Sequence, residues 1–452
     1  MVAEYLLHPE KNSYKLDYLS LDYLNYRMQP IEELIGTGLH QISMSEVPLQ
    51  DISYYAVEDS DVAFQLSSVL MNKLKEESLS VPYEEIELPL ISVLIEIEKN
   101  GVFLDMEYLS TLSVEFGESL NVLTEKIYKM SGREFNINSP KQLAEILFDE
   151  MELKQIKKRS TAVKVLEILK NHHPLPAVIL EYRHLAKLKS TYVDAFPNYV
   201  NKKTGRIHTS LNQTIASTGR LSSTGPNFQN IPIRTETGRK LRKAFIAQKD
   251  NWVILSADYS QVELRIMAHY SQEPELIKAF KDGADIHSRT AALVNGISLS
   301  EVTPEQRRSA KVVNFGIMYG AGPYRMSQEL GISMVDAKDL IQNYFETYPG
   351  IRRYMVETID KAKRNGFVET LYNRRRSAIN LNASNGNIVK AEERAAINMP
   401  IQGTAADLIK IAMININKRM KDENFSSKMI LQIHDELLFE CPKEEVEKLA
   451  IM

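Results

Sequence analysis

The sequence is poor in the features that mark secreted and membrane proteins. Its 452 residues include a single cysteine, Cys441, which excludes an internal disulfide framework and suits a reducing compartment. No apolar stretch is long enough to cross a bilayer, and the first residues, Met1 to Tyr5, have neither the basic nor the apolar region of a signal peptide. We therefore expect a cytoplasmic protein without membrane contact.

The chain also carries little net charge, but its charges are unevenly distributed. The formal net charge is −4, and residues 1–100 carry 18 acidic against 6 basic side chains, whereas residues 201–250 carry 10 basic against 2 acidic ones. Such a basic segment is typical of nucleic-acid binding, although an ordinary solvated surface also explains it. The length favours two or more domains.

Patterns along the chain predict a sheet domain that is interrupted by a helical one. Two helix starts are well formed, because Ser139 and Thr303 each precede a proline and have a glutamine three residues on. A polar stretch from Lys73 to Pro82 is interpreted as a linker. The predicted segments, in order, are short helices (1–80), a helical module (105–200), Gly- and Ser-rich loops (201–232), a strand ending at Asp258, helices (262–394) and strands (428–440).

Two aspartates occupy positions where a structural aspartate is unusual. Asp258 ends an apolar strand, and Asp435 interrupts the apolar segment from Ile430 to Phe439. On one straight strand Asp435 would share a face with apolar residues, where an unpaired carboxylate is costly. The alternative is a hairpin with His434 and Asp435 at its tip, although these are unusual turn residues. Either arrangement presents Asp435 at the edge of a sheet, where the two carboxylates suit divalent cations.

The segment after Asp258 has a second interpretation. Ser260 and Glu263 have the spacing of a capping box, so Glu263 could simply satisfy the start of a helix. Asp258 would then be a loop residue that precedes this cap. The presence of Asp435 favours the metal site.

A helix beginning at Thr303 is expected to present one basic and aromatic stripe. Arg307, Lys311, Phe315 and Tyr319 recur every four residues, so they share one face. Positive side chains in the first turns, where the helix dipole already favours anions, indicate a phosphate ligand. The aromatic rings further along could stack on a base. An ordinary amphipathic helix has the same spacing.

Three weaker signals complete the candidate site. Arg394 and Asn398, with Gln402 beyond Pro400, could read base edges in a minor groove or form an ordinary hydrogen-bonded helix surface. His287 is typical of a loop or core histidine. Arg220 lies in a flexible Gly- and Ser-rich stretch that suits a phosphate or groove contact.

Together these segments resemble the family A DNA polymerases, most closely the bacterial ones. The resemblance covers nearly the whole chain and is carried by three motifs in the family's order and spacing. The motifs are Asp258 to Arg265 (motif A), Arg307 to Gly320 (motif B) and His434 to Glu436 (motif C); Thr218 to Arg234 and Arg394 to Gln402 resemble further family blocks.

The resemblance implies an α+β, right-hand polymerase fold. Its palm is an antiparallel sheet, its fingers and thumb are helical, and the end of a 3′–5′ exonuclease-like α/β domain precedes them. The expected domains are the exonuclease-like remnant (1–80), the thumb with the start of the palm (81–200), the first part of the palm (201–262), the fingers (263–394) and the second part of the palm (395–452).

The implied activity is template-directed addition of deoxynucleotides to a primer 3′-end, in replication or repair. Asp258, Asp435 and the main-chain carbonyl of Tyr259 would hold two Mg²⁺ ions, which Mn²⁺ could replace, with Glu436 beside them. Lys311 would donate a proton to pyrophosphate. The implied partners are a primer–template duplex and dNTPs, and a monomer is expected.

The resemblance also assigns substrate contacts. Glu263 matches a steric gate against the ribose 2′-hydroxyl, and Phe315 indicates discrimination against dideoxynucleotides. The residues that match nucleotide-binding positions are Tyr259, Gln261, Glu263, His287, Arg234, Arg307, Lys311, Phe315 and Tyr319. Those that match duplex-binding positions are Arg220, Gln229, Asn230, Arg394, Asn398, Gln402 and His434.

Departures from the family pattern leave two alternatives. Tyr55 and Asp59 resemble only the last exonuclease motif, so proofreading is expected to be absent, as is a 5′-nuclease. The chain ends soon after motif C, which would weaken the strands around Asp435, and the basic loop from Lys157 to Thr161 is short. A catalytically inactive DNA-binding fragment is therefore one alternative. A single-subunit RNA polymerase is the other, although Glu263 speaks against it.

Overall fold

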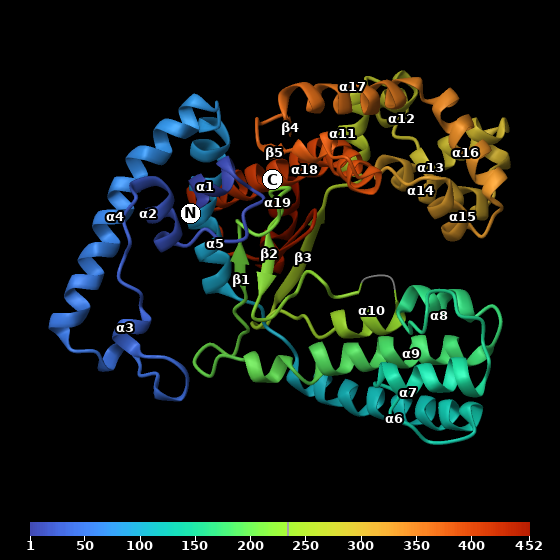
Figure 1. Cartoon of the computed structure of the whole chain (residues 1–452), viewed down its shortest axis with the longest axis horizontal. Coiled ribbons are helices and arrows are strands. Elements are labelled where there is room, and N and C mark those ends of the chain that lie inside the picture. Colours follow the sequence, from blue (N-terminus) through green and yellow to red (C-terminus); the bar gives the residue numbers. More distant parts are fainter. Residues whose placement is uncertain (233–234) are drawn as a thin grey trace.

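A three-stranded antiparallel sheet lies at the centre of the molecule (Figure 1). The computed structural model describes residues 1–232 and 235–452. The strand order is β3-β7-β6, so β7 is central, and Asp258 pairs with Glu436 across β3 and β7. The strands are β3 (Trp252–Asp258), β6 (Lys428–Ile433) and β7 (Glu436–Pro442).

The hairpin interpretation of the Asp435 segment is confirmed, and the single straight strand is wrong. Ile433 pairs with Glu436, so His434 and Asp435 form a two-residue connection between β6 and β7. His434 adopts a φ of 57°, which turns the chain. The hairpin removes Asp435 from the apolar faces of the sheet, where its carboxylate would have been costly.

Two helical lobes extend from the same side of this sheet (Figure 1). The first has a core that includes Leu112, Phe116 and Ile179, and Ser139 caps α7 as predicted, with its Oγ accepting from the Gln142 amide. Its helices are α6 (Met106–Ser131), α7 (Pro140–Ala144), α8 (Val163–Leu169), α9 (Pro174–Leu188) and α10 (Glu236–Arg242).

The second lobe follows β3 and has its own core around Val313, Ile317 and Tyr344. Thr303 forms the predicted capping box with Gln306 at the start of α14. The helices of this lobe are α11 (Val262–Ser271), α12 (Pro274–Lys281), α13 (Ile286–Asn295), α14 (Pro304–Met318), α15 (Pro323–Leu330), α16 (Met334–Thr347) and α17 (Pro349–Asn365).

The N-terminal region departs from the prediction of short helices and a linker. Helix α4 runs for 28 residues, and Leu74 and Leu79, inside the predicted linker, are buried. The reason is an apolar stripe at a spacing of four residues, which continues the helix through the polar positions. The helices of this region are α1 (Val2–Leu7), α2 (Leu16–Leu24), α3 (Glu32–Ile35) and α4 (Leu49–Glu76).

Helices α5 (Leu88–Asn100) and α18 (Gly386–Asp422) share a core with the sheet, which includes Leu94, Met413 and Phe439. Helix α18 passes through Pro400 and across the expected boundary at 394–395 without a break. Besides several short 3-10 and π-helical turns, the chain forms the π-helical turn η3 (Pro82–Glu87), β1 (Ser210–Asn212), β2 (Ser222–Thr224), β4 (Phe367–Glu369), β5 (Arg375–Ser377) and α19 (Val446–Ile451).

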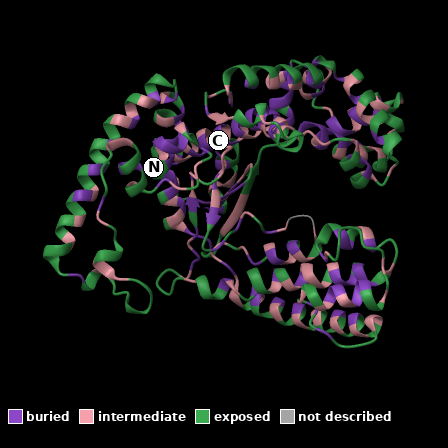
Figure 2. Ribbon diagram, in the orientation of Figure 1, coloured by how far each residue is buried: buried purple, intermediate pink, exposed green. Residues whose placement is uncertain are grey.

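Buried residues gather inside the lobes and beside the sheet, whereas the end of β3 that carries Asp258 is exposed (Figure 2). Among the described residues, no helix is both long enough and apolar enough to span a membrane. The last three residues of β3, Ser256, Ala257 and Asp258, are exposed.

Candidate active site

The carboxylates of Asp258, Asp435 and Glu436 converge at one end of the sheet. The Tyr259 amide donates to the Asp435 carbonyl at 3.2 Å, which joins the end of β3 to the hairpin turn. Partial burial, and then the negative charges of Asp435 and Glu436, raise the pKa of Asp258 above its ordinary value. A cation would relieve this repulsion.

Glu436 differs from the two aspartates because protein groups already compensate its charge. Ser256 Oγ donates to Glu436 Oε1 at 2.5 Å, and Arg242 Nη1 lies 3.9 Å from Oε2. Asp258 and Asp435 are therefore the candidate ligands for an external cation, together with the main-chain carbonyl of Tyr259.

The donor set fits Mg²⁺ that arrives with substrate. Within residues 1–232 and 235–452, no group of three or more His, Cys, Asp or Glu side chains is placed to hold a metal ion by itself. Mg²⁺ characteristically binds through one or two carboxylates together with substrate phosphates and water. Two aspartates and a carbonyl at an open strand end are consistent with that mode of binding.

A cleft of about 350 Å³ opens beside Asp435 and brings the predicted motifs together. Its walls come from the β6–β7 turn, the loop that carries Arg220, and helices α11, α14 and α18. The lining residues are Arg220, Leu221, Val262, Glu263, Phe315, Tyr319, Ala405, Ala406, Ile409, Lys410, Gln432, His434 and Asp435.

Glu263 does not form the capping box that its spacing suggested. Helix α11 begins after Gln261, which has a φ of 55°, and no side chain caps it. Glu263 instead accepts hydrogen bonds from Arg220 and from Tyr319 Oη. A capping box would give this carboxylate one backbone N–H, whereas here it gains a cation and a hydroxyl, which explains the outcome. Burial, and then the Glu263 charge, raise the pKa of Tyr319.

The stripe on α14 forms as predicted. Arg307 and Lys311 are exposed, whereas the half-buried rings of Phe315 and Tyr319 lie with their centroids 6.3 Å apart at an interplanar angle of 24°. The sequence did not indicate that Arg307 has an internal partner. Its Nη2 donates to Asp285 Oδ2 at 2.7 Å.

Asp285 accepts hydrogen bonds from two groups. One is Arg307, and the other is the Ser288 amide, a bond that caps α13. Burial alone would raise its pKa, but hydrogen bonds from Arg307 and Ser288 outweigh burial and lower the pKa to about 2. The carboxylate is therefore charged at neutral pH, and it competes with any phosphate for Arg307.

His287 is a core histidine in this structure. It is 2% exposed, its Nδ1 lies 3.1 Å from Asn314 Nδ2, and its ring centroid lies 5.9 Å from that of Phe315. Burial, together with the positive charges of Lys311 and Arg307, lowers its pKa below the ordinary value. The structure therefore packs this ring between α13 and α14. Arg234, also predicted to contact the triphosphate, lies outside the described residues.

The predicted duplex-binding residues lie on three elements around the cleft. Arg394, Asn398 and Gln402 follow one another along α18, and Arg394 packs against Gly320 at the end of the α14 segment. Asn230 is exposed on the loop before α10. The remaining members of the set are Arg220, Gln229 and His434.

Sequence reasoning missed Gln432 and Lys410, which both line the cleft. Gln432 Oε1 accepts from Gln229 Nε2 at 3.2 Å, and its own amide donates to the His434 carbonyl. Lys410 was detectable, because the four-residue spacing from Arg394 to Gln402 continues to it through Ala406. Gln432 carried no sequence signal, since its partners are brought to it only by the fold.

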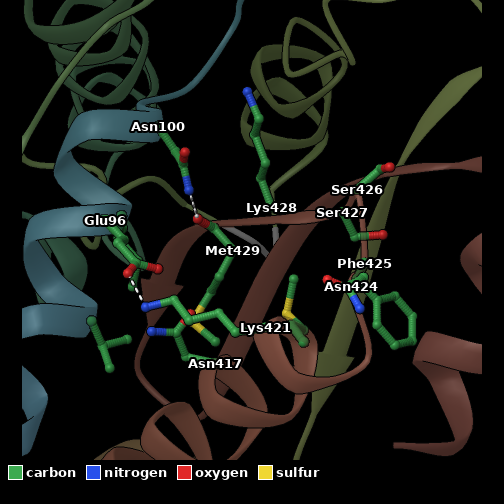
Figure 3. Close-up of a pocket in the computed structure, with 13 residues that line it drawn as sticks. Glu96, Asn100, Asn417, Lys421, Asn424, Phe425, Ser426, Ser427, Lys428 and Met429 are labelled. Carbon is green, nitrogen blue, oxygen red and sulfur yellow. Dashed lines mark hydrogen bonds and ion pairs between the residues drawn. The ribbon is translucent and has the colours of Figure 1, made fainter.

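A second cavity, of about 470 Å³, lies at the opposite end of β6, roughly 20 Å from Asp435 along the strand (Figure 3). Asn100 Nδ2 donates to the Met429 carbonyl there at 2.9 Å, and Lys421 pairs with Glu96. None of the predicted site residues lines it. Of the catalytic candidates, Asp435 lines the first cleft, and none lines this second cavity.

The site thus combines carboxylates at the end of a small sheet with aromatic residues of α14 that line the adjacent cleft. Comparison with known proteins identifies the family. The family model described as DNA polymerase family A matches residues 106–452, and the chain belongs to that family.

The relatives agree with this assignment. DNA polymerase I of Pseudomonas aeruginosa is 42% identical over 457 residues, which cover 100% of this chain and 50% of the relative. DNA polymerase I of Chloroflexus aurantiacus is 46% identical over 430 residues, covering 93% and 45%. The chain thus spans about half the length of the curated relatives that it matches.

A solved structure is also similar over the whole chain. It is described as the POL domain of Pol1 from M. smegmatis in complex with DNA primer-template and dNTP. The two share 38% sequence identity with a TM-score of 0.90, and the match covers 100% of this chain and 76% of the other. The α+β polymerase fold is therefore confirmed.

Proposed function

We propose that this chain is a DNA-templated DNA polymerase that adds deoxynucleotides to a primer 3′-end. The observation that carries the proposal is the meeting of Asp258 and Asp435, from distant parts of the sequence, beside a cleft that Phe315 and Tyr319 of the α14 stripe line. The similar M. smegmatis domain was solved with primer-template and dNTP, which supports these two substrates.

Two Mg²⁺ ions, or Mn²⁺ in their place, would be held by Asp258, Asp435 and the Tyr259 carbonyl. When bound, such ions lower the pKa of the attacking hydroxyl and balance the charge of the leaving pyrophosphate. The protein supplies the negative charge that attracts them and an open strand end that admits them. Glu436 helps indirectly, because its charge adds to the local potential while Ser256 and Arg242 hold it in place.

Residues of the α14 stripe bind the triphosphate. Lys311 is exposed and free to contact phosphate oxygens, and it donates the proton that pyrophosphate takes up. Arg307 contacts the phosphates after exchanging its bond to Asp285. Phe315 packs on the sugar and base, and Tyr319 lies near the template base. Three further residues complete this set: Gln261, Arg234 and His287. His287 is 2% exposed, so it contributes from the core beside Phe315.

Glu263 selects deoxynucleotides over ribonucleotides. Arg220 and Tyr319 hold its carboxylate in the cleft wall, where only 10% of the side chain is exposed. A ribose 2′-hydroxyl that approached this wall would meet a carboxylate that has little room to move. Phe315, beside it, discriminates against sugars that lack the 3′-hydroxyl.

Duplex binding extends the site along α18 and the neighbouring loops. Arg394, Asn398 and Gln402 lie along one helix, and Gln432 supports the positions of both Gln229 and His434. The remaining contacts of this proposal come from Arg220 and Asn230. One chain contains every group named, so a monomer suffices.

We do not expect residues 1–80 to have 3′–5′ exonuclease activity. Asp59 follows Glu58 on α4, and the Glu58 carboxylate accepts from Tyr26 Oη at 2.7 Å and from the Gln29 amide at 2.9 Å. Glu58 is therefore used in folding. We expect a primer with a mismatched 3′-end to keep its length when incubated with Mg²⁺ and no dNTP.

Primer extension with Mg²⁺ and dNTPs tests the main proposal. Asp258→Asn and Asp435→Asn should each lose two or more decades in rate, about 3 kcal/mol or more, whereas the exposed control Asp250→Asn should keep its rate. Binding of duplex without extension would refute synthesis and favour an inactive DNA-binding protein. Extension with rNTPs as fast as with dNTPs would remove the role of Glu263 and favour an RNA polymerase.

A further inference from the structure

Tyr5, near the N-terminus, is hydrogen-bonded to the loop that carries Arg220. Tyr5, on α1, is fully buried, and its Oη donates to the Ala216 carbonyl at 2.5 Å. The same carbonyl accepts from the Gly219 amide at 3.0 Å, which closes the turn. Tyr5 therefore fixes the turn whose next residue is Arg220.

Two further groups confine this turn. Gly219 has a φ of +84°, and a Cβ added to it would lie 2.6 Å from Arg374 Nε, so the Arg374 side chain packs directly against the backbone. A Cβ added to Gly403 of α18 would lie 3.2 Å from the Thr218 carbonyl oxygen. The turn is thus enclosed on three sides by α1, by Arg374 and by α18.

Arg374 is itself immobilised by a buried charge cluster, which we define as Glu87, Arg374, Asp407 and Lys410. Each of the four is at most 1% exposed. Arg374 Nε donates to Asp407 Oδ1 at 2.8 Å, its Nη2 donates to Glu87, and Lys410 Nζ donates to Glu87 Oε1 at 2.5 Å. The Arg374 side chain that packs against the turn is therefore part of a buried, hydrogen-bonded cluster.

We propose that Tyr5 is a positioning residue for Arg220 and, through Arg220, for the carboxylate of Glu263. Arg220 donates to Glu263, so a shift of the turn moves one of the two groups that hold this carboxylate. The first helix of the chain would thereby contribute to discrimination between deoxyribo- and ribonucleotides. This inference rests on the proposed polymerase function.

Tyr5→Phe is the variant that tests it, because it removes one hydroxyl and keeps the ring. Loss of one hydrogen bond should lower the ratio of kcat/KM for dNTP to kcat/KM for the matching rNTP by roughly two- to tenfold. The reason is that a Glu263 carboxylate held less firmly by Arg220 excludes the ribose 2′-hydroxyl less strictly. Tyr14→Phe is the matched control.

Tyr14 is a suitable control because it shares the environment of Tyr5 but not its target. The two rings pack edge to face with centroids 5.8 Å apart, and Tyr14 Oη donates to the His8 carbonyl at 2.8 Å. Both variants lose one hydrogen bond in the same cluster, so both should lose similar thermal stability. Only Tyr5→Phe should change the nucleotide ratio, and an equal change in Tyr14→Phe would overturn the proposal.

A double-mutant cycle asks whether the effect passes through Arg220. In an Arg220→Ala background, Tyr5→Phe should leave the nucleotide ratio unchanged, because the group that it positions is gone. Additive effects of the two substitutions would contradict the proposed route.

Hydrogen exchange separates this inference from the polymerase proposal. The Gly219 amide should exchange roughly two- to tenfold faster in Tyr5→Phe than in the unmodified chain, with no change in Tyr14→Phe. Unchanged exchange at Gly219 would refute positioning whatever the catalytic activity. Failure of the unmodified chain to extend primers would refute the polymerase function, while the exchange result would still decide whether Tyr5 holds the turn.

Discussion

The substitution Glu87→Gln provides a quantitative test of the buried charge cluster. Glu87 is fully buried between Arg374 and Lys410. Burial alone would raise its pKa, but the attraction of Lys410 and Arg374 outweighs burial and lowers the pKa to about 2. Glutamine keeps the shape of the side chain and removes its charge, which leaves two buried cations with Asp407 as their remaining anion.

The expected cost follows from two arguments that agree. A pKa near 2, against an ordinary value of about 4.3, corresponds to about 3 kcal/mol of preferential stabilisation of the charged form. Breaking a buried ion pair by removing one partner typically costs about 3–5 kcal/mol. We therefore expect Glu87→Gln to lose about 3 kcal/mol of unfolding free energy at neutral pH, a large part of the total for a typical domain.

The lowered pKa of Glu87 also predicts how the unfolding free energy changes with pH. Because the folded-state pKa of Glu87 is lowered, its stabilisation is complete above the unfolded-state pKa and is lost as pH falls toward 2. The unmodified chain should lose this contribution on acidification, and Glu87→Gln should not. Urea unfolding at a series of pH values from neutral to 2 measures both quantities.

A matched control lies on the neighbouring helix. Glu96 of α5 also pairs with a lysine of α18, Lys421, but this ion pair is exposed. Glu96→Gln should change the unfolding free energy by less than about 1 kcal/mol. Equal effects of the two substitutions, or an unchanged acid dependence in Glu87→Gln, would refute the reasoning about the buried cluster.

Three further predictions test the site and the N-terminal region. Asp285→Asn keeps the cap of α13 and frees Arg307, so KM for dNTP should fall about two- to threefold; a rise in KM would show that Asp285 positions Arg307 productively. Lys311→Ala should lower the rate of single-nucleotide incorporation more than Arg307→Ala, because Asp285 already neutralises Arg307; the reverse order would contradict this. Leu74→Ala should cost about 2–5 kcal/mol in chemical unfolding, and a negligible loss would favour the linker interpretation.

The parts of the structure that the sequence predicted well are those with local signals. Thr303 and Ser139 start helices because a cap needs only the next three residues. The two aspartates were recognised because a carboxylate after or within an apolar run is costly wherever the chain goes. Both kinds of inference depend on neighbours in the sequence; the two caps form, and the two aspartates lie at the same end of the sheet.

The parts that the sequence did not predict depend on partners that only the fold brings near. Glu263 has the spacing of a capping box, but Arg220 and Tyr319 offer it stronger bonds. The sequence predicts that Arg307 is a free cation, but in the fold Asp285 lies beside it and accepts its hydrogen bond. The linker prediction failed for the same reason, since the polar stretch around Leu74 is held helical by packing against other N-terminal residues.

These internal partners suggest a division of roles among the charged residues of the site. Protein groups already balance Glu436 through Arg242, Glu263 through Arg220, and Arg307 through Asp285. Among the residues that the structure describes, Asp258, Asp435 and Lys311 have no such ion pair. Charge that enters from outside gains most where no internal partner has to be displaced, so cations should be drawn to the aspartates and phosphate to Lys311. Glu263 is then suited to shape and selectivity, because Arg220 and Tyr319 fix its position before substrate arrives.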